Sequence, residues 1–164
     1  MDFASLYRQY ANDVFRFAYF LSGNHAVAED IAAETFARAL TAGDRIQTAT
    51  VKAYLLRIAR NLFVDALRRD SRLADLTGSE DQISDPAPNP EAVTRSRMEL
   101  EVTWQALATL SEGERAALLM SAVNGLSHEE IAAALELSVA AVRVRIHRAR
   151  LALSALKIRE ERKP

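Results

Sequence analysis

A segment near the C-terminal end constrains the fold of this chain more than any other. Residues 127–150 contain a short apolar helical pattern, a turn and a second helical pattern rich in arginine. Ser127 is placed to cap the first helix, and Glu130 completes the pattern of a capping box. Leu137 is expected to end the first helix, and Ser138 can cap the second. This arrangement predicts a helix-turn-helix, whose second helix fits the DNA major groove.

The second helix of this motif has two distinct sides. An apolar stripe that recurs every three or four residues is expected to be buried, and it consists of Val142, Ile146, Ala149 and Leu153. The opposite face and its flanks carry the predicted DNA-contacting residues: Arg143, Val144, Arg145, His147 and Arg148. Arginine can bond bidentately to guanine, and small apolar groups can contact a thymine methyl. The alternative, an ordinary amphipathic helix with a solvated basic face, is disfavoured because cap, turn length and arginine positions agree.

The charges of the chain are unevenly distributed, although its formal net charge is only −1. Residues 51–76 carry six basic and three acidic side chains, and residues 139–164 carry eight and two. Residues 77–101, between them, carry two basic and six acidic side chains. Phosphate attraction is local at physiological salt, where the Debye length is about 8 Å. Two separated basic blocks therefore predict two separate DNA contacts.

The periodicity is helical throughout, with no convincing alternating strand. Before the helix-turn-helix, helices are expected at about 2–21, 25–42, 51–72, 91–109 and 112–124. Gly43 is expected to end the second of them. Residues 73–90 hold Gly78, three prolines and four acids, a composition typical of a linker.

These patterns predict an all-α fold of two small helical domains joined by a flexible linker, with the helix-turn-helix in the second domain. The predicted boundaries are 1–74 for the first domain, 75–92 for the acidic linker and 93–164 for the second domain. Cysteine is absent, which excludes a disulfide framework and a thiolate metal site. No apolar run approaches the ~20 residues of a membrane span, and the N-terminus lacks a signal-peptide pattern. We therefore expect a cytoplasmic protein without membrane insertion.

The first basic block also has the residue types of a nucleic-acid surface. Its candidate DNA-binding residues are Lys52, Tyr54, Arg57, Arg60, Asn61, Arg68 and Arg69. Cations can hold phosphates, amides can contact base edges, and aromatic rings can stack on unpaired bases. The alternative is a core helix with a basic outer face, and for Phe63 we favour that packed interpretation because it lies near the apolar stripe.

Together, the two blocks resemble the extracytoplasmic-function (ECF) sigma factors of bacterial RNA polymerase. Residues 28–39 are similar to the polymerase-binding helix of that family. Residues 54–61, followed by Asp65, Arg68 and Arg69, are similar to its helix for the minus-10 promoter element. Residues 107–115 and 129–153 are similar to its minus-35 reader, although Glu136 stands where the family usually has glycine. The order and spacing of these motifs make the combination specific.

The resemblance implies a promoter-specificity subunit with no catalysis, cofactor or metal. Its expected partners are core RNA polymerase and promoter DNA, both double-stranded and locally melted; whether an anti-sigma factor also binds is left open. The implied polymerase-binding residues are Glu29, Asp30, Glu34 and Phe36, facing a basic coiled coil on the largest subunit. Without the resemblance, the three acids beside His25 would also fit a solvated helix face or, less well, a metal site.

Two other functions compete with this interpretation. One is a stand-alone helix-turn-helix regulator whose N-terminal helices form a sensor or dimerisation domain. The other is a pure protein-interaction module, which leaves the arginine-rich face unexplained. Nucleophilic catalysis lacks support, because the three histidines have no obvious serine and acid partners.

Overall fold

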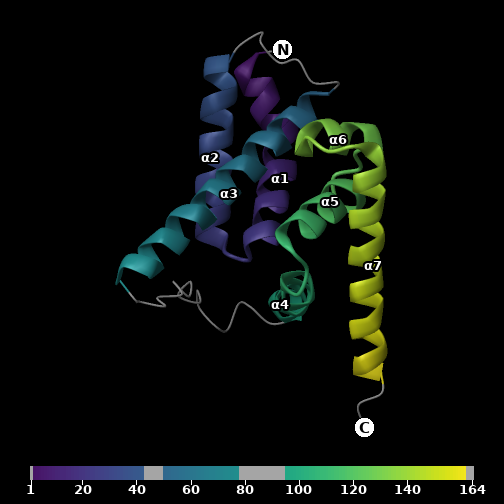
Figure 1. The fold of residues 1–164 in the computed structure, drawn as a ribbon. Helices are drawn as coiled ribbons and strands as arrows, with labels where there is room; N and C mark the ends of the chain where they lie inside the picture. Colours follow the sequence, from purple (N-terminus) through teal and green to yellow (C-terminus); the bar gives the residue numbers. More distant parts are fainter. Residues whose placement is uncertain (1, 43–49, 78–94, 162–164) are drawn as a thin grey trace. The chain divides into compact units, whose positions relative to one another are not determined.

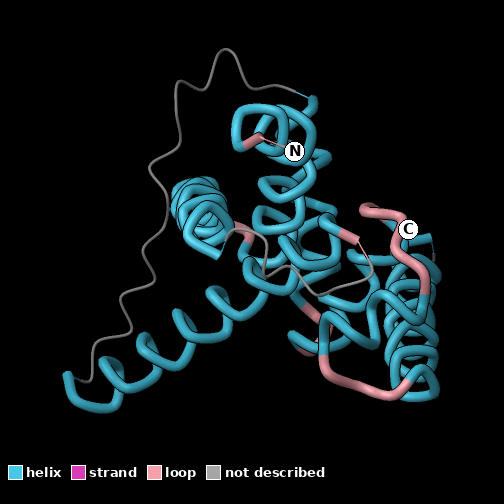
Figure 2. The backbone as a smooth tube through the Cα atoms, turned by 90° about the horizontal axis from the view of Figure 1, so that it is seen from above, coloured by secondary structure: helices cyan, strands magenta, loops and turns pink. Residues whose placement is uncertain are grey.

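The computed structural model describes residues 2–42, 50–77 and 95–161 (Figure 1). Within these ranges the secondary structure is helical, without strands, as the backbone trace in Figure 2 also shows. The all-α prediction is therefore confirmed for the described residues. The helices are α1 (Phe3–Ser22), α2 (His25–Ala42), α3 (Val51–Thr77), α4 (Arg95–Ala108), α5 (Glu112–Ala122), α6 (His128–Leu135) and α7 (Val139–Glu161).

The chain divides into two compact units, Met1–Pro86 and Ala87–Pro164. None of the described helices is long and apolar enough to cross a membrane. Residues 75–77 of the expected linker are helical instead, because α3 continues to Thr77. The rest of that segment up to residue 94 lies outside the described residues, as does the expected helix end at Gly43.

The first unit is a three-helix bundle in which α1, α2 and α3 pack against one another. Local hydrogen bonds and backbone conformation determine where α1 begins and ends and where α2 begins. The Asp2 carboxylate accepts a hydrogen bond from the Ser5 N–H (2.8 Å), and Gly23 ends α1 with a left-handed φ of 71°. The Asn24 side chain then accepts from the Val27 N–H (3.0 Å) at the start of α2.

The core of the first unit is formed by the apolar stripes of its helices. Its most deeply buried large side chains are Val14, Phe17, Leu21, Leu55 and Leu56. Burying side chains of this size stabilises a fold by roughly 1.5–3 kcal/mol each. This burial fixes which sides of α2 and α3 remain available at the surface.

The second unit is built around the contacts of α5, α6 and α7. Met120, Ile131 and Val142, one from each helix, are fully buried. Ser127 and Glu130 form the predicted capping box of α6, and the Ser138 hydroxyl accepts from the Ala141 N–H (3.1 Å) at the start of α7. The helix-turn-helix geometry is thus fixed by caps at both helices and by a shared core.

The first helix of the helix-turn-helix is shorter than expected. It ends at Leu135 rather than at Leu137. The next residue, Glu136, adopts a left-handed conformation (φ 56°), and its N–H donates to the Ala132 carbonyl. Because this conformation reverses the chain direction, it stops the helix two residues before the apolar pattern does.

Candidate nucleic-acid and protein interfaces

Helix α7 turns its predicted DNA-contacting face to the surface. Val142 and Ile146 are buried, whereas Arg143, His147 and Arg148 are exposed. Ala149 is also buried, and Leu153 at the far end of the stripe is half-buried. Val144, which lies on the same exposed side, is 46% exposed. The exposed face therefore combines guanidinium groups, which can bond to guanine, with an apolar group that can contact a thymine methyl.

Arg145 behaves differently from the other predicted contacts on α7. It is half-buried, and its guanidinium lies directly against Gly113 in the first turn of α5. A side chain at residue 113 would occupy the place of the Arg145 Nη1 atom. The glycine leaves the space for this close approach, so Arg145 is directed toward α5 rather than to the centre of the exposed face.

A buried arginine connects α4 and α5 in the second unit. The Arg115 guanidinium lies 5.1 Å from the ring centre of Trp104, and Arg115 is only 8% exposed. Burial lowers the pKa of Arg115, and the nearby Glu112 carboxylate opposes that shift. The contact joins α4 to α5 through a cation–π interaction, which holds α4 in place without presenting Arg115 to a ligand.

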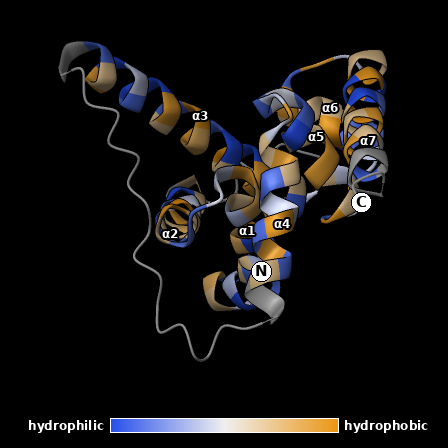
Figure 3. Cartoon of the chain, turned by 90° about the horizontal axis from the view of Figure 1, so that it is seen from below, coloured by the Kyte–Doolittle hydropathy of each residue, from blue (hydrophilic) through white to orange (hydrophobic). Residues whose placement is uncertain are grey.

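Helix α3 presents most of its predicted DNA-binding residues along one side. Asn61 and Arg68 are exposed there, and Tyr54 and Arg57 are half-exposed, at helical spacing from one another. Arg69 is exposed beside this row. Alternating hydrophilic and hydrophobic bands mark the helix in Figure 3. The row points away from Leu55, Ala59 and Leu62 in the core, so its cations and amide are available together.

Three residues of the first basic block lie elsewhere. The Lys52 Nζ atom is 3.9 Å from the Asp13 carboxylate of α1, with both side chains about one-third exposed. Arg60 is half-buried at the edge of the helix. Phe63 is 6% exposed, so the packed interpretation of this ring holds.

A basic pocket forms where α3 meets α2. It has a volume of about 350 Å³ and is lined by Arg38, Leu62, Asp65, Arg68, Arg69 and Arg72. Sequence analysis missed Arg38 and Arg72 as candidates. The spacing of Arg72 from Arg68 on one side of α3 was a usable signal. Arg38 had none, because only packing brings it to residues some thirty positions away.

The predicted polymerase-binding residues of α2 fall into two groups. Asp30 and Glu34 are exposed, and so is Glu29, whose carboxylate lies 3.4 Å from the His25 Nδ1 atom. Phe36 is only 2% exposed. The three exposed acids can contact a basic surface directly. Phe36 is buried, so it can contribute only by supporting the residues that lie above it.

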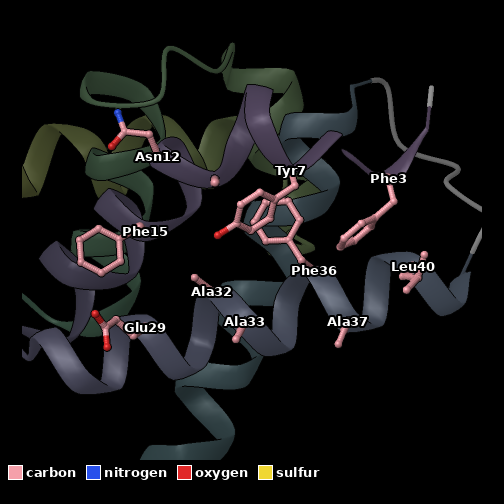
Figure 4. A pocket seen from close by; sticks show the side chains of 11 residues that line it. Phe3, Tyr7, Asn12, Phe15, Glu29, Ala32, Ala33, Phe36, Ala37 and Leu40 are labelled. Carbon is pink, nitrogen blue, oxygen red and sulfur yellow. The ribbon is translucent and has the colours of Figure 1, made fainter. Parts of the chain in front are cut away.

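Phe36 lies at the base of an apolar groove between α1 and α2 (Figure 4). The Tyr7 and Phe3 rings of α1 meet it edge-on, at centroid distances of 5.0 and 6.5 Å. The groove has a volume of about 830 Å³ and includes Leu40, which is 58% exposed. Sequence analysis missed the contribution of α1 to this surface. Across the described residues, no group of three or more potential metal ligands is gathered.

Comparisons with known proteins bear directly on these surfaces. Residues 6–73 match the family model of Sigma-70 region 2, and residues 100–153 match that of Sigma-70, region 4. The chain is 42% identical over 148 residues to the ECF RNA polymerase sigma factor SigE of Mycolicibacterium smegmatis, covering 88% of this chain and 57% of that protein. It is 33% identical over 153 residues to SigL of Mycobacterium tuberculosis, covering 91% of this chain and 85% of that one. The chain belongs to the ECF sigma factors.

Solved structures agree with this assignment. The sigma factor RpoE of Bartonella quintana, determined with the anti-sigma factor NepR, matches this ECF sigma factor with a TM-score of 0.81 and 28% identity. The match covers 94% of this chain and 96% of RpoE. CnrH, determined with the cytosolic domain of CnrY, matches with a TM-score of 0.70, covering 94% of this chain and 86% of CnrH. The resemblance inferred from the sequence is confirmed, although the chain spans little more than half the length of SigE.

Proposed function

We propose that this ECF sigma factor binds core RNA polymerase and directs promoter recognition, local DNA melting and transcription initiation. The observation that carries the proposal is that each family-matched region has its own exposed basic helix face. One is on α3, within the region-2 match, and the other is on α7, within the region-4 match. Two such faces suit two promoter elements read by one protein.

The two faces are suited to different forms of DNA. On α7, Arg143, His147 and Arg148 surround the exposed Val144, a combination for base edges in the major groove of the minus-35 element. On α3, Tyr54 lies on the same side of the helix as Asn61 and Arg57, so a ring is available to stack on unpaired bases. The α3 face is thus assigned to the minus-10 element, where the strands separate.

The polymerase contact is assigned to α2. Glu29, Asp30 and Glu34 offer three exposed carboxylates to a basic partner, and the groove above Phe36 offers apolar area beside them. Opposite charges across an interface accelerate association and fix its register. The protein itself carries no catalysis in this proposal, since it acts by positioning the polymerase. An anti-sigma factor, such as the NepR bound to RpoE, is a further proposed partner.

Run-off transcription with purified core enzyme tests this function. Genomic fragments transcribed by core enzyme with this protein, and not by core enzyme alone, are the expected result. The competing possibility, a stand-alone regulator, is disfavoured because both sigma regions match in the same chain. Stable binding to an operator without polymerase, together with no binding to core enzyme, would favour that regulator and overturn the proposal.

A further inference from the structure

The basic pocket between α2 and α3 has a composition suited to an anion. Four guanidinium groups line it, and among the described lining residues Asp65 is the single carboxylate. Buried Leu62 lies among these arginines and gives the pocket an apolar wall. Arginine clusters of this kind bind phosphate oxygens through charge-assisted, often bidentate hydrogen bonds.

The arginines of the pocket differ in how they are held. Arg68, Arg69 and Arg72 belong to α3, are exposed, and form no ion pair with any acid in the described part of the chain. Arg38 belongs to α2, and its Nε donates to the Glu34 carboxylate at 3.1 Å. The two partners of that ion pair are each about half exposed. Arg38 is therefore restrained by an acid that the proposed function assigns to the polymerase interface.

We propose that Arg38, Arg68, Arg69 and Arg72 bind a backbone phosphate of promoter DNA, and that Glu34 restrains Arg38 until polymerase engages Glu34. The proposal rests on the proposed function and adds to it a second DNA-contacting helix and a coupling between the two partners. A basic polymerase residue that pairs with Glu34 competes with Arg38 for the same carboxylate. Arg38 is then no longer paired with Glu34 and can bind a phosphate in the pocket. DNA therefore binds more tightly to the holoenzyme than to the free protein.

The energetic scale makes such a transfer feasible. An exposed ion pair between residues four apart on a helix is weak, so releasing Arg38 changes DNA affinity by only about twofold. The phosphate contact is detected in a different quantity, the salt dependence of binding. Each neutralised phosphate steepens the log–log slope of affinity against salt by about 0.9 for duplex DNA. The two quantities can be measured separately.

The first experiment measures the pocket in the holoenzyme. Promoter affinity of wild-type and Arg38→Ala holoenzymes is followed against salt concentration, with Arg8→Ala as the matched control. Arg8 is an exposed arginine of α1 that lines neither the groove nor the basic pocket. We expect the salt slope to fall measurably for Arg38→Ala, by at most the ~0.9 of one phosphate contact, and to stay unchanged for Arg8→Ala. An unchanged slope for Arg38→Ala, or equal losses for both variants, overturns the pocket.

The second experiment needs no polymerase, so it distinguishes failure of the pocket from failure of the proposed function. Binding of the free full chain to duplex and forked DNA is measured for Glu34→Gln, Arg38→Ala and the double variant. Glu34→Gln is expected to tighten binding about twofold, and the double variant to lose that gain, which marks coupling between the two residues. Equal gains with and without Arg38 overturn the restraint.

Inorganic phosphate is used to test whether the pocket binds a free phosphate anion rather than a phosphate of DNA. A titration of wild type and Arg38→Ala with phosphate is compared with their DNA affinities. Weak phosphate binding that parallels the loss of DNA affinity supports the proposal. Phosphate binding that depends on Arg38, with DNA affinity unaffected, assigns the pocket to a free anion and overturns its role in DNA binding.

Discussion

Glu136 occupies a backbone conformation that favours another residue type. Its φ of 56° is left-handed, and it is the one described non-glycine residue with a positive φ. For most L-residues this conformation costs roughly 1–2 kcal/mol, whereas glycine adopts it readily. The family usually places glycine here, so this chain retains the turn geometry with a less suitable residue.

Glu136→Gly is expected to stabilise the protein by about 0.5–1 kcal/mol, because relief of the φ strain exceeds the added entropy of the unfolded chain. Thermal unfolding followed by circular dichroism measures the effect. Glu136→Ala is the control, since it removes the same side chain but keeps a Cβ at the left-handed position. A higher unfolding temperature for the alanine variant than for the glycine variant contradicts this explanation.

Arg143 and Arg148 are expected to provide base contacts at the minus-35 element. Replacing either with alanine should weaken binding there by roughly 1–3 kcal/mol, the value of a bidentate pair with a base. Competition between cognate and mismatched duplexes measures the loss of discrimination. Normal transcription from the cognate promoter by the double variant sinks the assignment. Arg145→Ala is a useful comparison, since the packing of its guanidinium against Gly113 predicts a larger effect on stability than on base choice.

At the scale of elements, α2 has two chemically different sides. Glu29 and the apolar groove lie on the α1 side, whereas Arg38 joins the arginines of α3. Asp30 and Glu34 are exposed between these two surfaces. If the proposed interfaces are right, α2 is the element through which polymerase binding and DNA binding influence each other.

Reversal of both charges, Asp30→Lys with Glu34→Lys, is expected to abolish binding to core polymerase. Like charges across an interface cost several kcal/mol, and a basic partner turns attraction into repulsion. Affinity for core enzyme is measured by titration, with circular dichroism to verify helix content. Asp70→Lys with Asp75→Lys is the matched control, because these acids are exposed on α3 of the same unit. Unaltered core affinity in the α2 variant excludes this face as the interface.

The features that were predictable from the sequence are those with local causes. The caps of α6 and α7 are predictable because Ser127, Glu130 and Ser138 bond to groups only three residues away. The stripe through Val142 and Ile146 identifies the buried side of α7. Such signals need only helix geometry.

The features that were missed depend on packing between helices. Phe36 fits the apolar pattern of α2, yet its role as the base of a groove depends on Phe3 and Tyr7 of another helix. Arg38 joins the basic pocket only because α2 packs on α3. Periodicity identifies the buried side of one helix but does not specify which side chains of the next helix meet it.

At the scale of the whole molecule, the two units have separate cores. Val14, Phe17 and Leu21 pack within the first, and Met120, Ile131 and Val142 within the second. Each unit also carries its own basic face. Under the proposed function, each of the two modules therefore supplies its own DNA contact.

Separate fragments 1–86 and 87–164 are expected to fold, because each retains its own core. Circular dichroism and thermal unfolding of each fragment check this expectation. Only the full chain should support promoter-directed transcription, since neither fragment has both DNA contacts. A fragment without a cooperative transition contradicts independent folding, and promoter-specific initiation by one fragment contradicts the division of labour.

The aromatic residues are divided between the two units in a way that has a practical consequence. All four tyrosines and all six phenylalanines belong to the first unit, whereas the single tryptophan, Trp104, belongs to the second. Indole emission therefore originates from the second unit alone, and its ring lies against the Arg115 cation. Tryptophan fluorescence therefore reports on the module with the helix-turn-helix, and tyrosine absorbance or emission reports on the other module. The two modules can be followed separately in the native chain without an added dye.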